Sequence, residues 1–322
     1  MAEKKPAVWK RVVGYSAFSI FSLVLTFFLT FPYEPMKDTI RTFAMSQGYA
    51  VKIGSLGPGF FAVRASQVEV TKLSDPNAQL SAEAKGDGPT APTVPVMVDS
   101  ISMGPAFFPP GLAVKMKLLG GDVSGRVTGL SGTRRVRVDV EDIDLAKGNL
   151  KSSTGIDLAG EIEAHLDLSI PFVGGTPTTP AEPDLALATG SMTLETKSLA
   201  INGGTANITI AQFGPEPTPV DLPKILLGEI SGKLKIDKGA ATIEEFKSKS
   251  ADLEINISGA VKLAKRIEYA EPNMEVRVKP DPEFQKRLGL LGSALSMIGA
   301  DPKDPTWRLG RLTGYLGRPQ FR

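Results

Sequence analysis

Residues 156–170 read IDLAGEIEAHLDLSI, and apolar and polar side chains alternate along the whole stretch. The even-numbered positions are apolar or glycine, whereas the odd-numbered positions are mostly charged or polar. A period of two residues is typical of a strand that buries one face, and a helix does not produce it. The stretch therefore predicts a long β-strand, or a tight hairpin, with one apolar and one wet face.

The same alternation recurs in other parts of the chain, at residues 136–140, 230–236 and 253–263. Glycines and short polar turns separate these stretches, which is typical of antiparallel hairpins that repeat at irregular spacing. We therefore predict a mainly β protein built on one elongated, twisted antiparallel sheet. The predicted apolar sheet face consists of Ile156, Leu158, Ile162, Leu166, Leu168, Ile170, Ile230, Leu234, Ile236, Leu253, Ile255 and Ile257.

Three stretches rich in proline and glycine interrupt the strand pattern, at residues 86–95, 174–183 and 214–223. Proline cannot donate a hydrogen bond to a strand ladder, and these segments contain few side chains to bury. We predict flexible loops inserted at the ends of hairpins.

A short helix is predicted at residues 35–48, with Met36, Ile40, Phe43 and Ala44 on one face. It could lie on a membrane surface, but we expect it to pack on the β domain because its apolar stripe is short.

A second amphipathic helix is predicted near the C-terminus, at residues 282–298. Asp281 is suited to cap it and Pro282 to its first position. Its apolar stripe comprises Phe284, Leu288, Leu291, Leu295 and Ile298. We expect it to cover one face or end of the sheet, with a membrane-surface role as the alternative. Residues 307–310 and 312–317 are predicted as a final pair of strands.

The N-terminal part predicts a membrane anchor. Residues 12–31 contain no charged side chain and would span roughly 30 Å as a helix, the thickness of a bilayer core. The apolar side chains of this stretch include Val12, Phe18, Phe21, Leu25, Phe28 and Phe31, and the basic residues before it are Lys4, Lys5, Lys10 and Arg11. A cleaved signal peptide is the alternative, but its apolar run is shorter and ends in small residues.

The basic residues also predict the orientation of the chain. By the positive-inside rule they stay in the cytoplasm, so residues 1–11 form a cytoplasmic tail and residues 34–322 a domain on the other side of the membrane, which the resemblance described below places in the periplasm. The tail carries a net charge of +3 and the whole chain +2, so the rest sums to about −1. This balance argues against a nucleic-acid partner.

The chain lacks the residues that most catalytic and metal sites require. It contains no cysteine and a single histidine, His165, on the polar side of the predicted strand. Residues 228–233 only resemble a phosphate-binding loop, because the spacing is one residue short. Four acidic residues could approach a calcium ion, namely Asp139, Glu141, Asp142 and Asp144, but neighbouring arginines favour an exposed charged hairpin. We expect neither an enzyme nor a cofactor or metal site.

Three segments, residues 228–238, 253–263 and 307–319, carry a resemblance to a known family. Together with the basic tail and the single anchor, they resemble the type II secretion system protein N family, whose periplasmic domain is similar to the AsmA-like β-rich proteins. The resemblance implies an inner-membrane protein that binds other secretion-system proteins during protein export. The AsmA-like relatives imply an alternative, in which an apolar trough of the sheet carries phospholipid between membranes.

Overall fold

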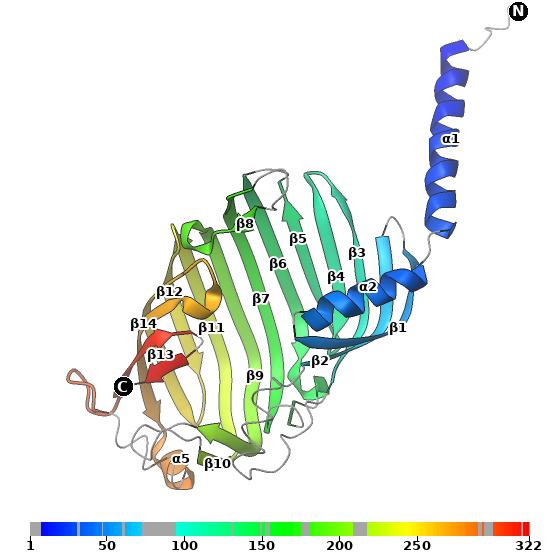
Figure 1. The fold of residues 1–322 in the computed structure, drawn as a ribbon. Helices are drawn as coiled ribbons and strands as arrows, with labels where there is room; N and C mark the ends of the chain where they lie inside the picture. Colours follow the sequence, from blue (N-terminus) through cyan, green and yellow to red (C-terminus); the bar gives the residue numbers. More distant parts are fainter. Residues whose placement is uncertain are drawn as a thin grey trace, which may run out of the picture.

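One large antiparallel β-sheet dominates the computed structural model of the chain (Figure 1). The structure describes residues 8–30, 33–46, 48–59, 62–72, 95–129, 132–148, 150–151, 155–175, 181–208, 218–288, 292, 299–316 and 318–321. Figure 1 shows that the sheet is twisted and curved, and that few helices accompany it. The predicted mainly β fold with an antiparallel sheet is therefore confirmed.

The strands lie in the sheet in the order in which they occur in the sequence, and β8 and β10 pair at its margins. Each strand of the main path is hydrogen-bonded to its neighbours in an antiparallel manner. The strands are β1 (Tyr49–Gly59), β2 (Ala62–Lys72), β3 (Val96–Phe107), β4 (Pro110–Leu118), β5 (Gly121–Thr128), β6 (Thr133–Asp144), β7 (Ile156–Val173), β8 (Glu182–Pro183), β9 (Thr189–Ile208), β10 (Thr218–Leu222), β11 (Ile225–Asp237), β12 (Ala240–Lys249), β13 (Leu253–Lys262), β14 (Glu271–Pro280), β15 (Arg308–Tyr315) and β16 (Arg318–Phe321).

The N-terminal helix α1 (Val8–Thr30) contains most of the residues predicted as the anchor. Val12, Phe18 and Phe21 are exposed on it, while Phe31 lies outside the described residues. Within the described part of the chain, no helix combines the length and apolar character that crossing a membrane requires. The anchor at residues 12–31 is therefore not confirmed and stays a prediction.

The second helix, α2 (Tyr33–Ser46), lies across the first strands of the sheet (Figure 1). Ile40 packs against a buried cluster that includes Ile53 and Val68, which confirms that this helix contacts the β domain. The prediction that Phe43 shares the packed face is wrong, because its side chain is 68% exposed. The face of the helix that packs on the sheet contains Ile40 and the aliphatic part of Lys37. This face lies about a quarter turn away from Phe43.

The predicted C-terminal helix is described over α5 (Pro282–Arg287). The Asp281 carboxylate accepts hydrogen bonds from the backbone N–H groups of Glu283 and Phe284, as a capping residue does. Phe284 is 1% exposed and, with Leu288, packs against Ile225 of β11. This helix therefore covers one end of the sheet, whereas Leu291, Leu295 and Ile298 lie outside the described residues.

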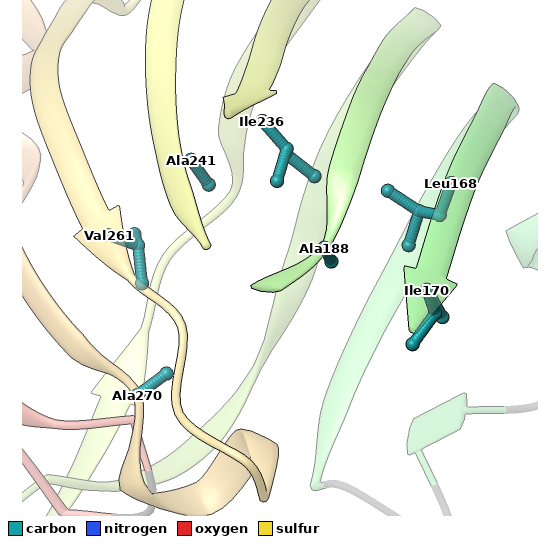
Figure 2. Close-up of a cluster of buried hydrophobic side chains, with 7 residues drawn as sticks. All are labelled: Leu168, Ile170, Ala188, Ile236, Ala241, Val261 and Ala270. Atoms are coloured by element: carbon teal, nitrogen blue, oxygen red, sulfur yellow. The ribbon is translucent and has the colours of Figure 1, made fainter. Parts of the chain in front are cut away.

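Three buried clusters line one side of the sheet. One lies under α2, one under α5, and the largest lies where β7, β11 and β13 end and β12 begins. Figure 2 shows that the side chains of the largest cluster point toward a common space, from these strands and from Ala188 and Ala270 beside them. Short 3₁₀ turns border it, namely η2 (Leu185–Leu187) and η3 (Ile267–Tyr269), and a third turn, η1 (Leu145–Gly148), follows β6.

Three strand predictions need correction. Residues 214–223 are predicted as a loop, yet residues 218–222 form β10 and pair with the far end of β9. Pro219 is tolerated there because β10 is a short edge strand. Residues 182–183 of another predicted loop form β8 beside Val173. Residues 307–310 and 312–317 do not pair with each other: residues 308–315 form one strand, and β16 follows it.

Candidate functional site: the apolar face of the sheet

All twelve residues predicted for the apolar sheet face lie on the same side of the sheet. Leu166 of β7 is in register with Met192 of β9, which is in register with Leu234 of β11. Directly opposed residues of an antiparallel pair share a face. The β13 residues belong to it because Val261, which shares their parity, is in register with Ala241 of β12. We call this side the apolar face and the opposite side the polar face.

The apolar face consists of continuous rows of residues that cross the sheet from strand to strand. The first row is Met103, Val114, Gly125, Val138, Leu166, Met192, Leu234 and Ile243. The second row is Ile101, Met116, Val123, Val140, Ala164, Leu194, Gly232 and Phe246. The third row is Leu112, Val127, Val136, Leu168, Gly190, Ile236, Ala241 and Val261. No position in these rows carries a charged or strongly polar side chain.

The middle of the apolar face remains partly accessible. Of the twelve predicted residues, Leu168, Ile170 and Ile236 are buried, whereas the others, Leu166 among them, are only partly buried. Within the described residues, α2 covers the apolar face at β1 and β2, and α5 covers it near the start of β11. A contiguous apolar surface that stays accessible across several strands marks a binding surface.

The polar face is held together by ion pairs between neighbouring strands. Asp167 accepts two hydrogen bonds from Arg135, at 2.7 and 2.5 Å, and a third from Arg137 at 3.0 Å. These bonds, those of Arg135 first, lower the pKa of Asp167 to about 2. Lys197 and Glu163 form a further cross-strand pair at 2.5 Å.

His165 lies on the polar face, where its Nδ1 contacts the Asp139 carboxylate. Asp139 also accepts a hydrogen bond from Ser124, while Glu141 and Asp142 are exposed. In the described residues, no three acidic or histidine side chains come close enough together to hold a metal ion. The geometry of this group is that of cross-strand pairing on a solvated sheet surface.

Exposed apolar side chains gather at one end of the sheet, where β3 turns into β4 and β15 into β16. We call this end the hairpin rim. Its exposed large apolar residues are Met103, Phe107, Phe108, Leu112, Val173, Leu187, Ile267, Tyr269, Tyr315 and Leu316. Phe108 is 92% exposed, and the Tyr269 and Tyr315 rings meet edge to face at 6.3 Å. Figure 1 shows that α1 extends beyond this same end, which β8 marks in the view.

Sequence reasoning missed the apolar residues of β3, β4 and β5, and it missed Arg134. Glycines and bulges disguise the alternation in the early strands: the register shifts by one residue between Val98 and Ser100. Arg134 was detectable, because it precedes Val136 and Val138 at a spacing of two.

Comparisons of the chain with protein-family models, with curated proteins and with solved structures find no match. The resemblance to the type II secretion system protein N family therefore stays a prediction.

Proposed function

We propose that this chain is a non-enzymatic, membrane-anchored protein that holds the acyl chains of a lipid against the apolar face of its sheet. The observation that carries the proposal is the set of three apolar rows, each crossing eight strands without a charged residue. Acyl chains have no polar groups to satisfy, so a long hydrocarbon surface binds them through burial alone. The AsmA-like resemblance supports the same function.

The partial exposure of these rows favours an exchangeable ligand over a permanent protein layer. A sheet that only needed a core would be covered along its length, as it is beneath α5, where Phe284 is almost fully buried. The centre of the face around Leu166 and Met192 lacks such a cover among the described residues. A lipid that enters and leaves requires this kind of opening.

The proposed location is the periplasmic side of the bacterial inner membrane. Its support is the charge-free run of residues 12–31 behind the basic residues of the tail. The position of α1 adds to this, because it extends beyond the hairpin rim (Figure 1). Aromatic side chains such as Phe108 and Tyr269 are typical of the boundary between lipid and water. The apolar face would then open toward the bilayer.

A second candidate function is that of a structural component of the type II secretion system. The open ends of the sheet favour it: β1 is hydrogen-bonded to β2 alone among the described strands, so its other edge is available to a strand of a partner protein. The sequence resemblance to the protein N family supports this reading. Lipid binding and partner binding use different surfaces, so one experiment can separate them.

The test is site-specific photocrosslinking in cells that express the full chain. A benzophenone amino acid replaces Leu166 in one variant and His165 in the other, two adjacent residues on opposite faces of β7. We expect crosslinks to phosphorus-labelled lipid at position 166 and none at position 165. Equal labelling at both positions, or labelling at neither, would overturn the lipid function. A further variant carries the same probe on β1. Crosslinks from β1 to a protein, without lipid crosslinks at position 166, would favour the secretion component.

A further inference from the structure

We propose that Arg134 binds the anionic headgroup of the lipid whose acyl chains lie on the apolar face. This inference rests on the proposed function and adds the site and charge of the headgroup. The stretch around it, Arg134-Arg135-Val136-Arg137, divides its three arginines between the two faces of β6. The apolar face receives only Arg134, which is in register with Ile170 of β7.

The two arginines on the polar face are neutralised, and Arg134 is not. Arg135 and Arg137 both bond the Asp167 carboxylate. Arg134 forms no ion pair with any carboxylate in the described part of the chain, and its Nε is buried without a hydrogen-bond partner there. A buried, unsatisfied cationic donor is costly, and an anionic ligand group would remove that cost.

The position of the guanidinium is fixed by its surroundings. Its Cζ lies 4.0 Å from the centroid of the Phe172 ring, a cation–π contact that holds one face of the planar group. Phe172 and Val136 border the largest buried cluster of the apolar face. The arginine therefore lies where hydrocarbon surface ends, beside the hairpin that joins β5 to β6.

The distribution of charged residues on the sheet indicates that the headgroup bound by Arg134 is an anion. None of the positions in the three rows is acidic, and Arg134 forms no ion pair with a carboxylate of the described residues. The carboxylates of β6 and β7, among them Asp139, Glu163 and Asp167, are on the polar face. A guanidinium at the end of the apolar face matches an amphiphile with a phosphate or carboxylate headgroup.

The experiment compares a charged and an uncharged amphiphile on the purified full chain in a non-ionic detergent. The probes are a dansyl-labelled fatty acid, a dansyl-labelled alkyl phosphate and the methyl ester of the same fatty acid, titrated by fluorescence. Arg134→Gln should weaken binding of the anionic probes about tenfold, which corresponds to about 1.4 kcal/mol, and leave binding of the ester unchanged. Arg134→Lys should retain most of the affinity, and the ratio of the two anionic probes identifies the headgroup.

The control is Arg126→Gln, an exposed arginine on the polar face of β5 without an ion pair among the described residues. It should leave all three affinities unchanged. Equal losses for acid and ester in Arg134→Gln would mean a purely structural role and overturn the headgroup site, as would no loss at all. Failure of every probe to bind the unsubstituted chain would instead overturn the proposed function itself.

Discussion

Asp167 of β7 pairs with two arginines of β6 on the polar face, and it should contribute measurably to stability. Asparagine at this position keeps the shape but loses the charge-assisted bonds from Arg135 and Arg137. We expect Asp167→Asn to lower the free energy of unfolding by about 1 kcal/mol, because the arginines are partly solvated. Urea denaturation of the full chain at pH 7 measures this, with Asp157→Asn as a control on the same face.

The same carboxylate predicts a pH dependence with a definite sign. Its pKa is lowered to about 2 in the folded chain, against about 3.9 in an unfolded one. The ionised form is therefore favoured by folding, so the stabilisation is complete above about pH 4 and is lost as the pH falls through about 2. The stability gap between the unsubstituted chain and Asp167→Asn should shrink over that window. A gap that stays constant would show that the ion pairs add nothing.

At the scale of single residues, alternation alone was enough to place the side chains of β7 on the correct face. It worked because β7 is long and each polar residue between Glu161 and Asp167 has a cross-strand partner or solvent on one side. Helical spacing failed for Phe43, because the rotation of a helix about its axis depends on the surface that the sheet presents to it. Alternation also failed to identify Arg134, because a charged residue in an apolar pattern indicates the end of a strand.

At the scale of elements, two glycines of the apolar face should respond oppositely to alanine. A Cβ at Gly190 would lie 2.0 Å from the Asp167 carbonyl oxygen, whereas a Cβ at Gly125 meets nothing within 4 Å. We expect Gly190→Ala to cost about 1–3 kcal/mol through overpacking of β7 against β9. Gly125→Ala should be neutral or slightly stabilising, since it restricts the unfolded chain. Denaturant midpoints of both variants check this, and equal effects would contradict the close approach of the strands.

Helix α5 should act as a local clamp on β11 and β13. Phe284→Ala empties the pocket formed with Ile225 and Leu288 and should cost about 3 kcal/mol. The buried carboxylate of Asp252 ties the same region together, because it accepts a bond from the Leu226 N–H and pairs with Arg287 at 2.7 Å. Hydrogen exchange should therefore accelerate at the start of β11 in Phe284→Ala. The exposed Lys286→Ala variant should leave exchange unchanged, and acceleration in both would argue against a specific clamp.

Helix and strand positions were predictable where the local pattern is strong. Asp281 followed by Pro282 located the start of α5 correctly, since capping depends on adjacent residues only. β10 was missed because it is short and prolines flank it at positions 215, 217 and 223, and its strand geometry comes from pairing with the overhanging end of β9. The last strands were divided wrongly because Arg311 interrupts the apolar alternation without ending the strand.

At the scale of the whole molecule, the hairpin rim should touch the bilayer. The chain has no cysteine, so a single cysteine can carry an environment-sensitive dye without further changes. In vesicles, a dye at Phe108→Cys should be quenched by brominated lipid, whereas a dye at Met97→Cys, near the opposite end of β3, should not. Quenching at Met97 alone, or at neither position, would contradict the proposed orientation. Recovery of the chain with the vesicles on flotation tests the anchor separately.

The overall topology was predictable as a series of consecutive hairpins, because glycines flank the alternating stretches that form the strands of each hairpin. The curvature was not, since it depends on bulges such as those at Ser198 and Asp142, whose positive φ angles reshape the strands locally. The accessible centre of the apolar face does not follow from the alternation, which shows only that the face is apolar. Leu288 packs against the sheet as predicted, but it covers only one end of the apolar face.

Because each strand of the main path pairs with the next one along the chain, the span of the sheet is set by how many hairpins the gene encodes. Inserting or deleting one hairpin would change that span by roughly 10 Å, two strand spacings, and would leave every other pairing intact. The length of such a sheet can therefore change in evolution one hairpin at a time.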